Sequence, residues 1–202
     1  MRRPSQTLAC LAALLVTIAA AGCQRAVESK EESSGNLPPF VADTTIKDLM
    51  LNVVDTNADV VWLSVTTVAS DKGLIETRPT TDEEWARVKA GAITLAEAAN
   101  LLMIPGRRVA RPGEKSETPG VELEPEEMDK LIQADPGKFY EHAKALHNAA
   151  MLAAKAADAK DADKIFEVGE TIEHACENCH KTYWYPNEVI PQFPTQPEPA
   201  KK

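Results

Sequence analysis

Two cysteines and a histidine near the end of the chain have the types and spacing needed to attach a porphyrin. The sequence Cys176-Glu177-Asn178-Cys179-His180 is a C-x-x-C-H motif, the attachment signal of c-type haem. On a helix, positions three and four residues apart lie on one face, so both thiols and the imidazole would project together. The motif therefore predicts one haem held by two thioether bonds, with His180 as an axial ligand of its iron.

Three other uses of this cysteine pair fit the sequence less well. A zinc site would need a further thiolate or imidazole, and the chain has no second C-x-x-C and no paired histidines near it. A thioredoxin-like redox pair belongs at the start of a helix after a strand, whereas this pair follows a helical pattern. A disulfide between residues three apart on a helix has poor geometry. Haem attachment remains the interpretation that the residues favour.

Helices must position this motif, because the apolar residues between 44 and 186 recur with helical periodicity and without strand-like alternation. The first helix is expected from about Thr44 to Val68, although its many β-branched residues lower its propensity. A capping box, Thr81-x-x-Glu84, opens the second, and Pro105-Gly106 ends it.

The second half of the chain predicts two more long helices. A helical turn is expected at 124–127, and the third helix begins at Asp135-Pro136, a cap followed by proline. The fourth begins near Asp161 or Asp163, runs into the motif and is ended by Pro186. We therefore predict an all-α, antiparallel four-helix bundle with two short connections and one long one.

The first residues have the layout of a bacterial secretory signal: two arginines, then an apolar stretch from Leu8 to Ala21. The sequence around Cys23 resembles a lipobox, which predicts a signal peptide over 1–22 and a lipid anchor on Cys23. Cleavage after Ala21 or Gly22 without lipidation is the alternative, and would release a periplasmic protein.

Polar or proline-rich segments flank the helical domain. Residues 23–43 are expected to be a flexible tether and 187–202 a proline-rich tail. The full chain carries a net charge of −9, and loss of the two leader arginines makes it −11. This acidity argues against nucleic acid as a partner and favours redox proteins with a basic docking face.

Three stretches resemble the class II c-type cytochromes, the cytochrome c prime group, in a bacterial lipoprotein-linked branch. They are 50–62, 95–102 and 176–186, and the resemblance extends from Thr44 to Pro186. It implies a left-handed four-helix bundle with haem against the fourth helix and a distal side formed by the first. Homodimers occur in this family, and the sequence does not decide whether this chain forms one.

The resemblance also implies that a residue on the first helix faces the iron opposite His180. Met50 occupies the matching position and is the candidate sixth ligand. The alternatives are an open site shielded by Met50, Leu49 or Val53, and ligation by His142 or His147 of the third helix. His174 lies six residues before His180, a rotation that points it away from the haem.

Several neighbouring side chains have weaker assignments. Trp62 and Trp85 are expected to be core anchors, and the aromatic run 183–185 is expected to cover the haem end of the bundle. Lys181, Arg107 and Arg108 are candidates to pair with haem propionates.

The ligand set decides among three functions. With His180 and Met50 both bound, the iron would exchange electrons without binding substrate, and the chain would be a membrane-tethered electron carrier in the periplasm rather than an enzyme. With the sixth position open, it would be a gas-binding haem protein for nitric oxide or carbon monoxide. A small peroxidase-like enzyme is the third hypothesis, for which no distal acid–base pair is recognisable.

Overall fold

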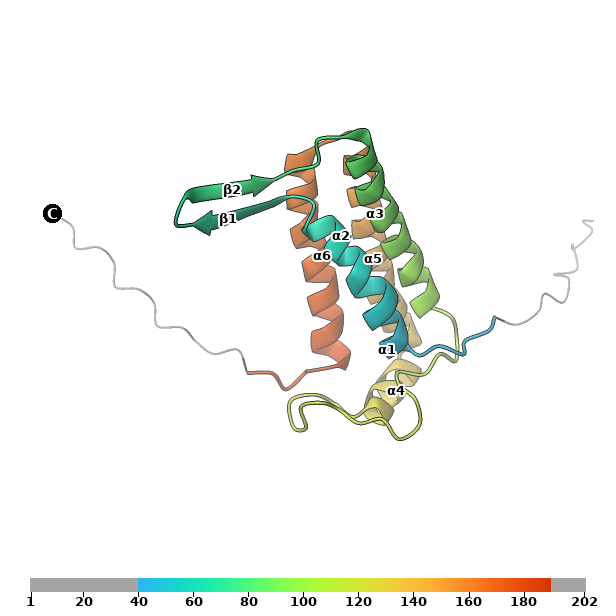
Figure 1. Cartoon of the computed structure of the whole chain (residues 1–202). Coiled ribbons are helices and arrows are strands. Elements are labelled where there is room, and N and C mark those ends of the chain that lie inside the picture. The colour runs from blue at the N-terminus through green and yellow to red at the C-terminus, as the bar shows by residue number, and fades with distance from the viewer. Residues whose placement is uncertain (1–39, 190–202) are drawn as a thin grey trace, which may run out of the picture. The chain divides into compact units, whose positions relative to one another are not determined.

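The computed structural model describes residues 40–189, and three long helices, α3, α5 and α6, run side by side through it (Figure 1). The predicted signal peptide, Cys23, most of the tether and nearly all of the tail lie outside these residues. The helices are α3 Asp82–Leu102, α5 Pro136–Asp158 and α6 Ala162–Tyr183. Each begins where the sequence predicts, capped by Thr81, Asp135 and Asp161 respectively.

The fourth element of the bundle is shorter than the other three and consists of three consecutive helical segments, which we call the first helical rod. It comprises α1 Ile46–Leu49, a π-helical segment Met50–Val54 and α2 Asp55–Trp62. Thr45 and Asp48 form a capping box at its start. The widened π turn lies at the predicted iron-facing position, and π segments are frequent at functional sites.

The prediction that the first helix runs to Val68 is wrong. The rod ends at Trp62, and the chain then forms a hairpin of β1 Thr66–Ser70 and β2 Gly73–Thr77. Gly73 takes a positive φ of 108° after the turn, and the β-branched residues of β1 favour a strand over a helix. The described residues are therefore mostly helical rather than all-α, and the hairpin extends away from the bundle (Figure 1).

The connections between the helices also differ from the predicted two short and one long, because of the same hairpin. One short connection, at 159–161, joins α5 to α6, while the hairpin makes the first connection long. The helical turn expected at 124–127 is the start of a ten-residue helix, α4 Pro125–Ala134, with Pro125 in its first turn.

Small side chains let the long helices approach closely. α3 and α5 bury a row of alanines against each other, and the largest fully buried side chains are Leu95, Val61, Ile165 and Ile172. Trp85 is buried in this core, as expected, whereas Trp62 is half-buried. A second cluster of Leu49, Leu102, Phe139, Ala143 and Tyr183 lies at the motif end of the bundle.

Buried polar contacts fasten the long connection between α3 and α4 across that end. The Arg107 side chain donates to the carbonyl oxygens of Leu101 and Thr44, and Asp129 accepts from Val109 N and Arg108 Nε at 2.9 and 2.6 Å. Arg107 and Arg108 thus hold this connection in place, and their pairing with propionates stays a prediction. Among residues 40–189, no helix is long and apolar enough to cross a membrane.

Candidate functional site

A cavity of about 430 Å³ lies at the end of the bundle that the second apolar cluster occupies. Its walls come from the first helical rod, α5, α6 and the connection before α4. Cys176, Cys179, His180 and Met50 all line it. The structure therefore brings the four predicted site residues of the described region to one cavity, within the size range of small-molecule and cofactor sites.

Helical spacing places the motif on the cavity side of α6. Cys176, Cys179, His180 and Tyr183 follow one another at intervals of three, one and three residues, and all line the cavity. Cys176 packs against the main core, and Cys179 packs against the second cluster. The inward stripe of α6 thus changes from aliphatic residues to thiols and imidazole where the cavity begins.

The first helical rod contributes mainly apolar side chains to the cavity wall, in contrast to the thiols and imidazole from α6. Ile46, Met50, Val54 and Ala58 line the cavity at intervals of four residues. Leu49 is buried in the second cluster and Val53 is half-buried, but neither lines the cavity. Of the three residues considered for the distal side, Met50 is the one in the wall.

The two thiols are not activated. Burial, with the negative charge of Glu173 and Glu177 nearby, raises the pKa of Cys176 to about 11. Burial also raises the pKa of Cys179 to about 12. A catalytic or redox-active cysteine needs the reverse, a lowered pKa, so these values argue against a thioredoxin-like pair.

His180 is held between aromatic rings and kept neutral. Burial lowers its pKa, and the carboxylates of Glu177 and Glu173 oppose that shift. Its ring meets those of Trp184 and Tyr185 edge-on, at centroid distances of 5.1 and 5.8 Å. Neutral imidazole is the form that ligates a metal, and the two rings limit its rotation.

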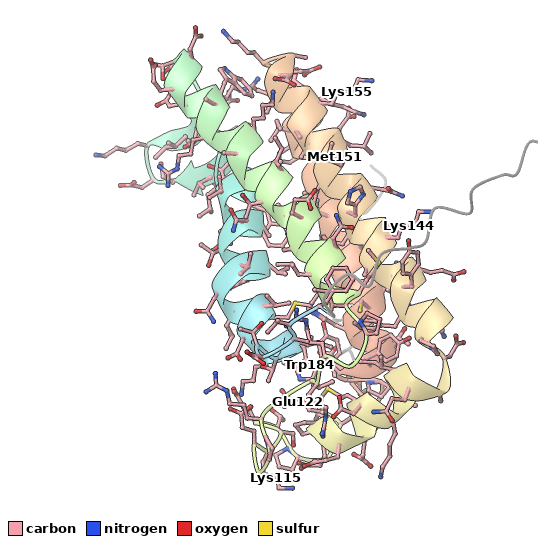
Figure 2. The ribbon with its side chains drawn as sticks, turned by 90° about the vertical axis from the view of Figure 1, so that its right-hand side faces the viewer. Lys115, Glu122, Lys144, Met151, Lys155 and Trp184 are labelled. Atoms are coloured by element: carbon pink, nitrogen blue, oxygen red, sulfur yellow. The ribbon has the colours of Figure 1, made fainter. Side chains whose placement is uncertain are left out.

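Glu177 orients the residues around the histidine. Its carboxylate accepts a 2.6 Å hydrogen bond from the Tyr185 hydroxyl and pairs with Lys181 at 2.9 Å. Lys181 is therefore paired within α6. Trp184 is 40% exposed at the cavity mouth, and its carbonyl accepts from Leu123 N, which ties α6 to the connection before α4. Figure 2 shows Trp184, Glu122 and Lys115 at this end of the molecule.

α5 contributes one of the two histidines that were alternative ligand candidates. His142 lines the cavity from α5, with its Nε2 3.4 Å from Thr182 Oγ1 and its ring edge-on to Tyr183. Burial lowers its pKa. His147 is half-buried but does not line the cavity, and His174 is exposed on another face of α6.

One buried polar atom in the cavity wall lacks a partner. Tyr183 is 7% exposed, and its hydroxyl is the one buried side-chain N or O atom without a hydrogen bond among the described residues. A buried hydroxyl without a partner is costly, so it points to a polar group of a bound molecule. The largely apolar walls, the two thiols, the imidazole of His180 and this donor fit a porphyrin, which has flat apolar faces and acidic side chains.

Some residues of the cavity wall could not be identified from the sequence. Met128 and Pro125 of α4 and Ser116 of the preceding connection also line the cavity. They lie outside the bundle stripes, and only the folded position of that connection reveals them. Among residues 40–189, no three His, Cys, Asp or Glu side chains are grouped to hold a bare metal ion.

Comparison with known proteins gives a limited likeness. No protein-family model matches the chain, and no curated protein matches it. Solved structures of cytochrome c prime from Alcaligenes xylosoxidans do match the chain. The nitric oxide complex of one variant is 20% identical, covering 70% of this chain and 98% of that chain, with a TM-score of 0.43. A ferrous variant of the same protein is 18% identical over 70% and 98%, with a TM-score of 0.42. The structural neighbours are thus cytochromes c prime at low identity, and the cavity residues have to carry the functional assignment.

Proposed function

We propose that this chain is a mono-haem c-type cytochrome that carries electrons in the periplasm, tethered to a membrane through lipid on Cys23. The observation that carries the proposal is that a C-x-x-C-H motif and a methionine from another helix line one apolar cavity. The haem would supply reversible one-electron exchange at its iron.

The cavity residues have distinct parts in this proposal. The thiols of Cys176 and Cys179 would form thioethers, which keep the cofactor attached without a large domain around it. His180, neutral and flanked by two aromatic rings, would be the proximal ligand. Met50 would be the distal ligand and would exclude exogenous ligands from the second axial position.

A five-coordinate, gas-binding haem protein is the second candidate. Ile46, Val54 and Ala58 line the cavity beside Met50, and Lys47 and Asp55 of the same rod line it too. If the methionine sulfur does not reach the iron, the apolar side chains would leave room for a diatomic ligand. The two candidates therefore differ in one bond.

Absorption spectroscopy of protein made in cells that mature c-type cytochromes tests both candidates. We expect colour that survives acid–acetone extraction, a sulfur-to-iron charge-transfer band in the ferric state and no shift of the ferrous spectrum with carbon monoxide. A high-spin spectrum that shifts with carbon monoxide would favour the gas-binding candidate. Colourless protein, or pigment lost on extraction, would refute covalent haem attachment altogether.

His180 and His174 provide a matched pair on one helix. His180→Ala should abolish the native ferric spectrum, because it removes the proximal ligand. His174→Ala should leave it unchanged, because His174 is exposed and lies outside the cavity. Equal spectra for the two variants would contradict the assignment of His180.

A further inference from the structure

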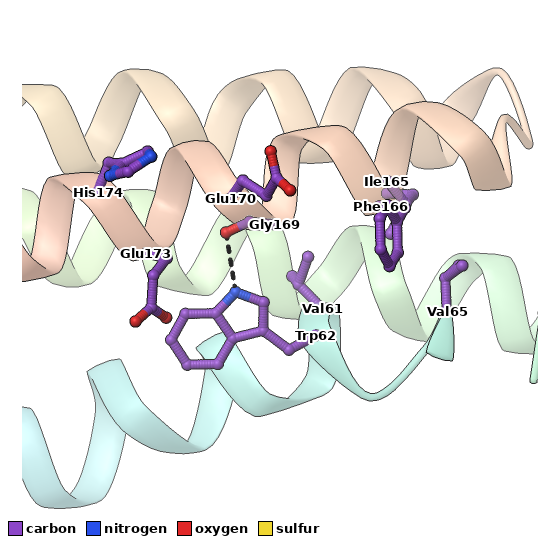
Figure 3. Close-up of a pocket in the computed structure, with 9 residues that line it drawn as sticks. All are labelled: Val61, Trp62, Val65, Ile165, Phe166, Gly169, Glu170, Glu173 and His174. Carbon is purple, nitrogen blue, oxygen red and sulfur yellow. Dashed lines mark hydrogen bonds between the residues drawn. The ribbon is translucent and has the colours of Figure 1, made fainter. Parts of the chain in front are cut away.

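A second cavity, which shares Trp62 with the first, lies between the end of α2 and the first half of α6. It measures about 510 Å³, and its walls include Trp62, Phe166, Gly169, Glu170 and Glu173. Figure 3 shows the Trp62 ring between the two helices, with Glu173 beside it and Phe166 further along α6. We call these five residues the Trp62 groove.

Packing fixes the floor of the Trp62 groove. The indole N–H of Trp62 donates to the Gly169 carbonyl at 3.1 Å, the dashed line in Figure 3. A Cβ on residue 169 would lie 3.3 Å from Trp62 Cδ1, so glycine is what lets the ring approach this closely. The aromatic wall is therefore preformed.

The groove exists because the first helical rod is short. Phe166 follows the buried Ile165 on α6. The rod ends at Trp62 and the chain turns into the hairpin, so Phe166 remains 55% exposed. The exposed Phe166 and the half-buried Trp62 therefore leave apolar surface in the groove that a bound segment would cover.

The rim of the Trp62 groove is acidic. Within residues 40–189, neither Glu170 nor Glu173 forms an ion pair. An aromatic floor with an acidic rim fits a proline-rich segment that carries positive charge, because polyproline helices dock on aromatic grooves and lose little entropy in doing so.

The chain itself contains such a segment. Residues 190–202 read IPQFPTQPEPAKK, with prolines at 191, 194, 197 and 199, one aromatic residue, Phe193, one acidic residue, Glu198, and two lysines, Lys201 and Lys202. We propose that this tail segment binds in the Trp62 groove of its own chain, with its prolines and Phe193 on the aromatic wall and its lysines near Glu170 and Glu173. The proposal does not depend on the haem assignment.

The tail is long enough to reach. From Tyr183 back to Gly169 is fourteen residues of α6, or about 21 Å at the helical rise. Thirteen residues in polyproline conformation span about 40 Å. Because the tail is covalently attached, its effective concentration at the groove is in the millimolar range, so even a weak contact would be populated.

Zero-length carbodiimide coupling, which joins a lysine amine to a carboxylate in contact with it, tests the proposal on the full chain. We expect mass spectrometry to find Lys201 or Lys202 coupled to Glu170 or Glu173. The exposed Glu97 and Glu141, on other helices, serve as reference carboxylates. Coupling spread evenly over all four carboxylates would overturn the proposal.

Two further arms identify the occupant. A mixture of ¹⁵N-labelled and unlabelled chains should give cross-links within one isotope only, and mixed-isotope products would assign the groove to a second copy instead. Phe193→Ser should reduce coupling severalfold, whereas Gln192→Ser should not. Equal coupling in these two variants would show that the aromatic contact is absent and would also refute the proposal.

Discussion

At the scale of single residues, the proposed chemistry depends on four side chains that reach one cavity from two helical elements. Burial raises the pKa of both motif thiols and lowers that of His180, so all three groups are neutral at neutral pH. Neutral groups suit a largely apolar cofactor, because none of these three groups carries a charge that has to be desolvated when it binds.

Met50→Ala tests the distal ligand. If the Met50 sulfur binds the iron, the variant should lose the sulfur-to-iron charge-transfer band and its ferrous form should bind carbon monoxide. Met151→Ala is the matched control, since Met151 is 44% exposed on the outer side of α5 (Figure 2). An unchanged spectrum in Met50→Ala would show that Met50 is not the ligand, and His142 and Met128, which also line the cavity, would be the next candidates.

At the scale of elements, close approach of the first helical rod to the rest of the bundle defines the site. Gly91 of α3 faces Val60 of α2, and a Cβ on residue 91 would lie 2.6 Å from Val60 Cγ1 and 2.9 Å from Val60 Cβ. No relaxed structure tolerates these distances, so the glycine sets how near α2 lies to α3. It thereby helps to set the position of the cavity wall.

Gly91→Ala should therefore destabilise the protein by about 1–3 kcal/mol, the usual range for overpacking. At an ordinary helical site the same change stabilises by about 1 kcal/mol. Gly137 of α5 is such a site, because its nearest neighbour is 3.5 Å away, and Gly137→Ala is the control. Urea unfolding measures both. Restoration of stability in Gly91→Ala/Val60→Ala would identify the clash as the cause, and a stable single variant would contradict it.

At the scale of the whole molecule, many surface carboxylates stabilise the fold through caps and cross-element pairs. The Thr45 N–H lowers the pKa of Asp48, Lys160 lowers that of Asp82, and the Thr80 N–H lowers that of Glu84. A carboxyl whose pKa is lowered by folding contributes stability above its unfolded value, and this contribution is lost as the pH falls through the folded value.

The contribution of these carboxyl groups to the free energy of unfolding should therefore be constant near neutral pH and fall in acid, below the ordinary values of 3.8 for aspartate and 4.5 for glutamate. Urea midpoints measured from neutral pH to about pH 3 give the curve. Glu84→Gln should flatten part of it, because the amide does not titrate. A curve identical to that of the parent would show that the α3 capping box contributes nothing to the pH dependence.

The proposed membrane attachment also concerns the whole chain. If Cys23 carries lipid, Cys23→Ser should move the protein from the membrane fraction to the soluble periplasmic fraction with its spectrum unchanged, because Cys23 lies far from the C-x-x-C-H motif in sequence. Fractionation followed by haem staining measures this. Equal membrane association of the variant and the parent would refute the lipid anchor.

The C-x-x-C-H motif, the three long helices and the residues at which these helices begin can all be predicted from the sequence alone. Those features are local: Thr81 with Glu84, Asp135 with Pro136, and the cysteine spacing act within one turn of chain. The choice of Met50 rests on the resemblance of residues 50–62 to class II c-type cytochromes, and helical periodicity only places Met50 on the inward side of its helix.

Three features could be found only in the folded structure. They are the residue at which the first helix ends, the presence of His142 and Tyr183 in the cavity wall, and the contacts by which Arg107 and Arg108 hold the connection between α3 and α4 in place. The apolar residues around Val65 and Val68 are compatible with a helix or a strand, and neighbouring elements select between the two. Which side chains share a wall depends on contacts between residues far apart in sequence, and no local pattern encodes those contacts.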